Sequence, residues 1–322
     1  KEEMTCFRRR VPATPSLQAA PRQSVWRSQR TRTSRHQKGS VPMARPVFLA
    51  AMGLCSAVSA VHIPSPTGTY APFVSRTYEM LAEAGVTMRP YEIPDELAVV
   101  EGAGGAHLTV RSFCTDKLRQ GRLLLLDGGP SLQVLNLCFF PRLDLPLPTF
   151  SADLVTLRGG SLIAIDCQPN GRSPPPNKEA DAALDAAFAH HRPRLPSGGP
   201  IPPESARFFS RRFLWSRLPA QITPTQIQEL VLPAFEEYLQ AYLRLMTDST
   251  PLSDDADVEA VRAAQLEYTR YRTEEDPARP MLSRIFGNDL AERLLREVLF
   301  DLPLVLESSQ SDTLYSRNLG TP

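Results

Sequence analysis

The chain has 322 residues, of which 42% are hydrophobic, so it is long enough for one large soluble domain or two small ones. Its formal net charge of +1 hides an uneven distribution. Residues 1–60 hold 11 of the 36 basic and 2 of the 35 acidic residues, which leaves 25 basic and 33 acidic residues, a charge of −8, in the rest of the chain. An acidic body argues against a nucleic-acid-binding protein, because phosphate groups bind to a basic face.

The first 64 residues differ in composition from the remainder. Residues 1–42 are rich in Arg, Ser and Gln without a periodic apolar face, so we interpret them as an upstream or targeting segment that is disordered. Residues 43–64 resemble a signal peptide, with Arg45 in a short charged start, an apolar run from Val47 to Val61 and small residues at its end. The apolar run is short for a membrane span, and an anchored helix is the alternative interpretation. The folded domain is expected to occupy residues 65–322.

The first half of this domain is predicted to be a short helix followed by a meander of strands. Tyr78–Ala84 is a helix candidate that Gly85 ends. Turn signals separate the later strands at Gly128-Gly129-Pro130 and Arg158-Gly159-Gly160. Connections this short favour antiparallel pairing, because parallel strands need crossovers of a dozen or more residues. The strand candidates are His107–Cys114, Arg122–Asp127, Leu132–Phe140, Asp153–Leu157 and Ser161–Cys167.

The second half of the domain is predicted to be mainly helical. A Pro-rich surface loop at 170–178 precedes a helix at Glu179–His191, and a Pro/Gly loop leads to an aromatic segment at Phe208–Leu218. Apolar residues at helical spacing then predict helices at Pro233–Met246 and Asp257–Glu275 and a last helix capped by Asn288. Strands in the middle of the sequence with helices before and after them predict an α/β fold, a three-layer α/β/α sandwich with a central antiparallel sheet.

Motifs for metals and nucleotides are missing from the sequence. No two of the five cysteines are spaced as a CxxC pair, so neither a zinc nor an iron–sulfur site is expected, and the five histidines offer little further information. There is no P-loop and no GxGxxG after a strand, which weighs against nucleotide or nicotinamide use. We expect no metal site.

Two acidic residues occupy unusual positions. Asp153 follows a stretch rich in Leu and Phe and directly precedes an apolar strand, so its carboxyl group can lie in a partly apolar setting that raises its pKa. Asp276 ends a helix because Pro277 follows it. From the residues alone, an ordinary strand-start Asp and an ordinary helix-end turn residue are the alternatives.

Several blocks of sequence carry a resemblance to a known family. In chain order they are PYEIPDE (90–96), QVLN (133–136), ADLVTL (152–157), LIAIDCQP (162–169), LPSGGPIPPES (195–205), FFSRRFLWSRL (208–218), LPAFEEYL (232–239), YTRYRTEEDPARPML (268–282) and EVLFDL (297–302). From about Tyr70 to Leu302 the chain resembles the ferredoxin-dependent bilin reductases. The blocks at 198–204, 208–219 and 268–279 are most similar to members that convert 15,16-dihydrobiliverdin to phycoerythrobilin.

The resemblance implies a reaction and a pair of catalytic residues. Two electrons arrive singly from the [2Fe-2S] cluster of reduced ferredoxin, so the bilin passes through radical states, and the enzyme itself binds no cofactor. Asp153 on the sheet side and Asp276 on the helical side are the implied proton donors. Asn136 stands where the phycocyanobilin-forming branch has a histidine, and as an amide it can hydrogen-bond the bilin without titrating. An Asn satisfied by the backbone is the alternative.

Arginines are the candidate partners of the bilin propionates. Arg272 lies four residues before Asp276, where it can either bind that carboxyl group or hold a propionate. Arg211, Arg212 and Arg217 are further candidates, with ordinary surface arginines as the alternative.

The resemblance also implies partners and a compartment. The partners are ferredoxin, the bilin substrate and the preceding bilin reductase that would hand it over, with no nucleic acid and no membrane for the mature protein. Docking of acidic ferredoxin needs a local basic patch, for which Arg142, Arg158, Arg279 and Arg284 are candidates. The signal-like segment fits an algal plastid (the chloroplast stroma) as destination. The remaining alternatives are reduction of biliverdin to 15,16-dihydrobiliverdin, both steps in one pocket, or a bilin carrier that does not reduce its ligand.

Overall fold

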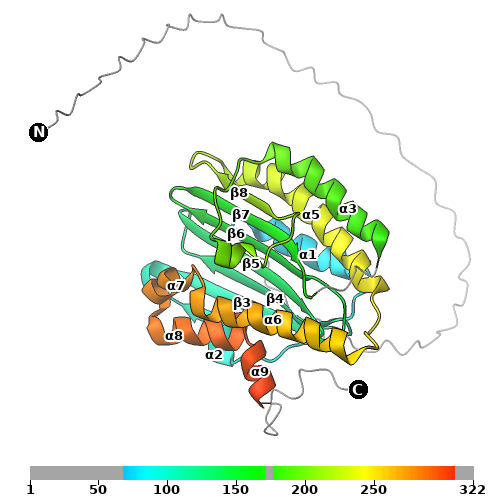
Figure 1. Cartoon of the computed structure of the whole chain (residues 1–322). Helices are drawn as coiled ribbons and strands as arrows, with labels where there is room; N and C mark the ends of the chain where they lie inside the picture. Colours follow the sequence, from blue (N-terminus) through cyan, green and yellow to red (C-terminus); the bar gives the residue numbers. More distant parts are fainter. Residues whose placement is uncertain (1–67, 172–176, 309–322) are drawn as a thin grey trace, which may run out of the picture. The chain divides into compact units, whose positions relative to one another are not determined.

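The computed structural model describes residues 68–171 and 177–308, and its centre is one antiparallel sheet (Figure 1). The strands follow the order β1-β3-β4-β5-β6-β7-β8, and β2 pairs with β3. In the described residues the strands are β1 Arg89–Pro90, β2 Val99–Glu101, β3 His107–Cys114, β4 Leu118–Asp127, β5 Leu132–Pro141, β6 Thr149–Leu157, β7 Gly160–Gln168 and β8 Leu214–Leu218. Sequence neighbours from β3 to β8 are therefore also neighbours in space, which is the meander that the short connections predicted.

Helices cover both faces of this sheet. In the described residues they are α1 Ala71–Glu83, α2 Asp95–Ala98, α3 Lys178–His191, α4 Pro203–Ala206, α5 Pro224–Asp248, α6 Asp255–Glu275, α7 Arg279–Phe286, α8 Asn288–Arg293 and α9 Leu302–Ser308. Short 3-10 turns at Ala103–Gly105 (η1) and Arg192–Arg194 (η2) and a π-helical turn at Leu294–Leu299 (η3) complete the set.

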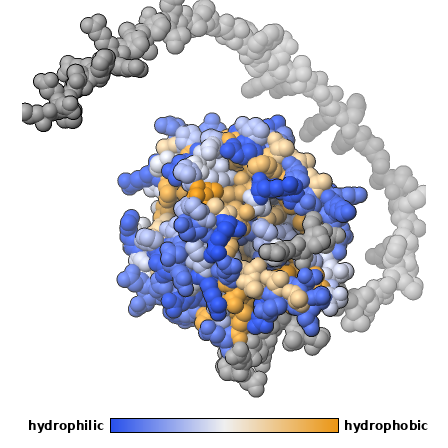
Figure 2. All heavy atoms as spheres, viewed as in Figure 1, coloured by the Kyte–Doolittle hydropathy of each residue, from blue (hydrophilic) through white to orange (hydrophobic). Residues whose placement is uncertain are grey.

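Two hydrophobic cores lie on opposite faces of the sheet. One joins α1, α3 and α5 to residues such as Leu135, Phe139 and Leu154. The other joins α7, α8 and η3 to residues such as Val134 and Phe140. Figure 1 shows these two helical layers with the sheet between them, and Figure 2 shows apolar side chains between the layers on an otherwise mainly hydrophilic surface. The predicted three-layer α/β/α sandwich is confirmed.

The elements differ from the sequence expectations mainly at their ends. α1 begins at Ala71, seven residues before the expected start at Tyr78, and β4 begins at Leu118 rather than Arg122. α5 begins at Pro224 and contains Pro233 in its interior, whereas the sequence predicted Pro233 as its first residue. The capping box of Thr223 and Gln226 begins this helix instead, and packing of its apolar face into the core retains the helix across the proline.

The helical half also contains a strand, and one expectation for its last helix was wrong in detail. In the aromatic segment 208–218, only Leu214–Leu218 forms a strand, because it pairs with β7 whereas the residues before it turn. Asn288 does not cap the last helix: it is the first helical residue, and Gly287 with its positive φ of 86° occupies the capping position.

Part of the sequence predictions falls outside the described residues. This holds for the targeting segments at 1–42 and 43–64, so the leader and the plastid destination stay predictions, and for residues 172–176 of the Pro-rich loop. Within the described part of the chain, none of the helices combines the length and apolar character that crossing a bilayer requires.

A buried ion pair joins the sheet to the C-terminal layer. Arg119 Nη1 donates to Asp301 Oδ1 at 2.9 Å, and both side chains are 2% exposed. The hydroxyl group of Tyr91 and the amide group of Gln120 also donate hydrogen bonds to Asp301, so protein donors replace the water that its carboxylate loses on burial. Removing one partner of such a pair leaves an uncompensated buried charge, which costs more than the pair itself contributes.

We predict that Arg119→Met lowers the free energy of unfolding by about 3–5 kcal/mol, because the buried carboxylate group of Asp301 then lacks its counter-ion. Adding Asp301→Asn is expected to recover at least half of this loss, since the charge is gone while the amide oxygen still accepts from Tyr91. Urea denaturation of the single and double variants at neutral pH measures both effects. Equal instability of the two variants would contradict the assignment of the loss to an unpaired charge.

Candidate functional site

A row of directly opposed residues crosses the sheet from β4 to β8. Leu124 pairs with Asn136, Asn136 with Asp153, Asp153 with Ala164 and Ala164 with Trp215. Directly opposed residues point to the same face of a sheet, so all five side chains lie on the face that α6 to α9 cover. Leu124 is buried under the C-terminal helices, whereas the other four are half-buried. The β5–β8 part of this face is therefore the less covered part.

The two polar residues of the row belong to a chain of hydrogen bonds. Arg122 Nη2 donates to Asn136 Oδ1 at 2.6 Å, and Asn136 Nδ2 donates to Asp153 Oδ1 at 3.3 Å. Arg122 Nη1 donates to the carbonyl oxygens of Val298 at 3.1 Å and Leu299 at 2.5 Å, in the last turn of η3. A guanidinium group can only donate, so the amide oxygen of Asn136 must face it and the amide nitrogen must face Asp153.

The environment of Asp153 favours its protonated form. Burial against the surrounding protein raises the pKa of its carboxyl group, while the positive charge of Arg272 and the hydrogen bond from Asn136 act in the opposite direction. The negative charge of Asp276 raises the pKa of Asp153 further. An acid of this kind keeps its proton at a pH where an exposed Asp has lost it.

Asp276 approaches from the helical side, at the end of α6. It is 6% exposed, and its backbone leaves the helix with a ψ of 122° because Pro277 follows. Its Oδ2 accepts from Arg272 Nη2 at 2.6 Å, and its Oδ1 accepts from the backbone N–H of Ala278 at 2.7 Å. The i, i+4 spacing of Arg272 and Asp276 thus produces an ion pair in the ligand-free protein.

A cluster of aromatic rings begins beside this ion pair. The guanidinium carbon of Arg272 lies 5.5 Å from the centre of the Phe300 ring. Tyr268 contacts Phe300 edge-on at 6.2 Å and also packs against Phe208 at 5.4 Å between ring centres. Burial raises the pKa of the Tyr268 hydroxyl group to about 12, so it stays a neutral hydrogen-bond donor. The helical side of the site is therefore a cationic group and an acid set among apolar rings.

The other arginine candidates lie elsewhere. Arg217 is exposed on β8, paired in register with Leu162, on the same face as Asp153. Arg212 forms ion pairs with Asp181 and Asp185 of α3, and the exposed Arg211 also pairs with Asp185. The structure thus brings Asn136, Arg272 and the two acids together, keeps Arg217 on their side of the sheet, and engages Arg211 and Arg212 with α3 instead.

Two residues of the candidate site were not predicted from the sequence. Arg122 is fully buried although it forms no ion pair with a carboxylate in the described part of the chain, and burial lowers its pKa. Its only sequence signal is a single Arg at the start of the apolar run LLLL, which is as typical of a strand end as of a buried cation. Trp215 stands in the same row as Asp153, but this follows from the register of two further strand pairs.

The arrangement offers acids, an amide and guanidinium groups that face a partly apolar sheet. In the described part of the chain, the group of His, Cys, Asp or Glu side chains placed to bind a metal consists of His190, His191 and Glu237, on α3 and α5. These helices cover the opposite face of the sheet. The side chains of the site can bind an anionic group through a guanidinium group and can exchange protons through their carboxyl groups.

Comparison with known proteins identifies the family of the chain. The family model described as "Ferredoxin-dependent bilin reductase" matches residues 78–301. The phycoerythrobilin:ferredoxin oxidoreductase of Nostoc punctiforme is 40% identical over 248 residues, covering 72% of this chain and 93% of the relative. That of Parasynechococcus marenigrum is 38% identical over 241 residues, covering 70% and 92%.

A solved structure shows the same similarity in three dimensions. Tomato phytochromobilin synthase in complex with biliverdin superposes with a TM-score of 0.66 at 25% sequence identity, covering 79% of this chain and 85% of the tomato chain. The family match spans well over half of the sequence. The chain is an oxidoreductase that belongs to the ferredoxin-dependent bilin reductases.

Proposed function

We propose that this protein reduces 15,16-dihydrobiliverdin to phycoerythrobilin, with reduced ferredoxin as the electron source and without a bound cofactor. The relatives named phycoerythrobilin:ferredoxin oxidoreductase support this step within the family. One structural observation supports the proposal most: the half-buried acid Asp153 has a raised pKa, and a second acid, Asp276, lies close enough for its charge to contribute to this shift.

In the proposed mechanism, the two acids deliver the two protons of the reduction. Ferredoxin transfers one electron to the bilin, Asp153 donates its proton to the radical anion, and a second electron and a proton from Asp276 complete the reduced double bond. Two electrons and two protons are added, and solvent restores both carboxyl groups. The non-titrating amide of Asn136 holds Asp153 in place and can donate to the bilin, so proton transfer is confined to the acids.

Arg272 connects substrate binding with the second acid. In the empty site it is the counter-ion of Asp276. A bilin propionate that binds Arg272 competes with Asp276 for the same guanidinium group, and the displaced carboxyl group becomes free to accept and donate a proton. Arg217, exposed on the same face of the sheet, is the proposed partner of the other propionate. Arg211 and Arg212 would first have to release their α3 partners.

We predict that Asp153→Asn retains bilin binding but lowers the turnover number by about 100-fold or more, because the amide keeps the shape and hydrogen bonds of the acid without its proton. Anaerobic assays with reduced ferredoxin and the visible spectrum of the bound pigment measure turnover and binding separately. Asp166→Asn is the matched control, since Asp166 is a buried acid on β7 whose carboxylate accepts from Ser210. Normal turnover in Asp153→Asn would refute the donor role.

The pH dependence should report the state of Asp153. Its raised pKa means that the proton is held to a higher pH than usual, so the rate falls as the pH rises through that pKa. Asn136→Leu removes a hydrogen bond that favours the anion, which raises this pKa further and shifts the high-pH fall of kcat/KM to higher pH. Profiles of wild type and variant measure the shift. If the high-pH fall of kcat/KM does not move in the variant, or moves to lower pH, protonation of Asp153 does not control the rate.

The same assay distinguishes the proposed step from its alternatives. Conversion of 15,16-dihydrobiliverdin to a product with the spectrum of phycoerythrobilin supports the proposal. Conversion of biliverdin instead would show that the protein catalyses the preceding step, the formation of 15,16-dihydrobiliverdin. A coloured complex that does not change when reduced ferredoxin is added would show that the protein is a bilin carrier. The proposed hand-over of substrate from the preceding reductase is tested by adding that enzyme in excess and following whether free intermediate appears.

Ferredoxin docking is proposed to use exposed arginines near the site. Arg158 and Arg284 are exposed and make no ion pair among the described residues, whereas Arg142 pairs with Asp144 and Arg279 with Glu292. Unpaired arginines are free to meet an acidic partner, although the body as a whole is acidic.

We therefore predict that the reduction rate at low ferredoxin concentration falls as ionic strength rises. Arg158→Ala and Arg284→Ala are each expected to raise the KM for ferredoxin by about threefold, because one exposed charge mainly changes the association rate. Arg76→Ala, on α1, is the control with little effect. Rates measured from low to high salt test the prediction, and a rate that does not respond to salt would exclude electrostatic docking.

A further inference from the structure

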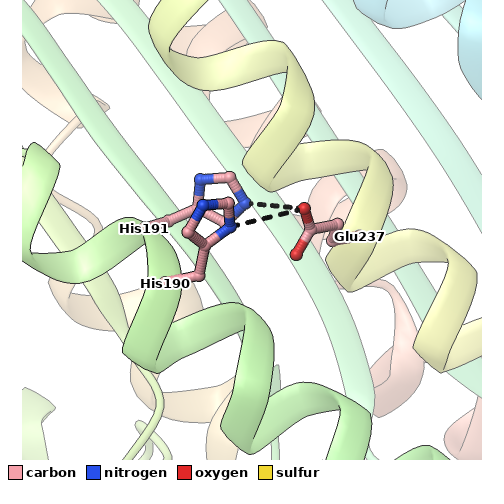
Figure 3. Close-up of side chains that lie close together, drawn as sticks. All are labelled: His190, His191 and Glu237. Carbon is pink, nitrogen blue, oxygen red and sulfur yellow. Dashed lines mark ion pairs between the residues drawn. The ribbon is translucent and has the colours of Figure 1, made fainter.

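Three metal-ligating side chains converge where α3 meets α5. His190 and His191 are the last two residues of α3, and Glu237 lies on α5 facing them (Figure 3). Glu237 Oε1 lies 3.1 Å from His191 Nε2 and 3.7 Å from His190 Nδ1. The three ligand atoms are all within 4.8 Å of one another. The two rings are 4.5 Å apart between centres, and in Figure 3 both direct a nitrogen toward the carboxylate.

The spacing of these atoms suits a small divalent ion. Zinc binds His nitrogen and carboxylate oxygen at about 2.0–2.1 Å in tetrahedral geometry, which puts neighbouring ligand atoms about 3.4 Å apart. The two distances to Glu237 lie on either side of this value. Two imidazoles and one carboxylate are a ligand set that suits zinc, whereas calcium and magnesium prefer oxygen ligands only.

The buried histidine provides a second, independent observation. The side chain of His191 is 3% exposed, and among residues 68–171 and 177–308 its Nε2 finds no hydrogen bond of acceptable geometry, although Glu237 is only 3.1 Å away. A buried polar nitrogen that lacks a hydrogen bond is rare, because burial removes the water that would otherwise bind it. His190 and Glu237 are 46% and 44% exposed, so the outer side of the cluster is in contact with solvent.

We propose that His190, His191 and Glu237 form a zinc site that links the C-terminal end of α3 to α5. His191 Nε2, His190 Nδ1 and one carboxylate oxygen of Glu237 are the protein ligands, and solvent completes the coordination. The site is structural, because α3 and α5 pack on the face of the sheet opposite to Asp153. It is independent of the reduction that we propose above.

The linkage joins elements that are far apart in the sequence. α3 and α5 are separated by the segment that contains η2, α4 and β8, and η2 begins directly after His191. An ion bound by the last two residues of α3 therefore holds the point at which the chain leaves the helix. Zinc is expected to raise the melting temperature of the protein, since an ion that binds the folded state alone stabilises it.

Zinc binding to the full chain tests the proposal, with any affinity tag removed and cysteines kept reduced. Equilibrium dialysis and thermal melting with and without Zn²⁺ compare wild type with His190→Gln and Glu237→Gln, which change exposed groups and preserve the core. In each variant the affinity of this site for zinc is expected to fall by about 100-fold, so that dialysis finds one bound zinc ion fewer than in wild type. The zinc-dependent rise in melting temperature is then lost as well. Bilin reduction should be unchanged in both variants.

His107→Gln is the matched control. His107 also pairs with a glutamate, Glu101, at 2.6 Å on the surface, but it has no second histidine beside it. This variant should bind zinc like wild type. The absorption spectrum of Co(II) bound in place of zinc identifies the type of ligand, because nitrogen and oxygen ligands give visible d–d bands without a thiolate charge-transfer band. Equal zinc binding in wild type and both variants, or a spectrum from thiolate ligands alone, would overturn the proposal and leave an ordinary ion pair.

Discussion

The register between β5 and β6 is the constraint on which the rest of the site depends. It places Asn136 directly opposite Asp153, and the pairing of β6 with β7 and of β7 with β8 extends the same row to Trp215. Because side chains alternate along a strand, a slip by one residue would turn Asp153 into the core between the sheet and α5. The fully buried Ala152 and Leu154 on either side of Asp153 oppose such a slip, since they would then lose their places in that core.

The two faces of the sheet differ in the side chains that they carry. The face under α1, α3 and α5 is packed with aromatic rings, among them Phe139, Phe150 and Tyr242, with ring centres 5.4–6.1 Å apart. The other face combines apolar packing with buried polar groups such as Arg122 and Asp301. The first face supplies the rigid support that a site built on strands needs, and the second uses it to hold ionisable groups at fixed positions.

Much of this organisation could be predicted from the sequence, and the failures have physical causes. Strand alternation and short turns are local signals, so the meander was predictable. The extent of α5 was not, because Pro233 normally starts or ends a helix and only packing against the sheet keeps it inside one. Resemblance to a family could propose Asp153 and Asp276 as candidate proton donors. It could not show that Arg211 and Arg212 pair with α3, since ion pairs between distant segments leave no local pattern.

The bonds of Arg122 have a consequence for how the protein is made. Its guanidinium group, carried by β4, holds the carbonyl oxygens of Val298 and Leu299 and, with its other end, orients the amide of Asn136. Residues from the first half of the folded domain thus reach their working geometry only when residues near its end have docked. A fragment that ends before Val298 lacks both carbonyl groups that hold Arg122, so it also lacks the contact that orients the amide of Asn136.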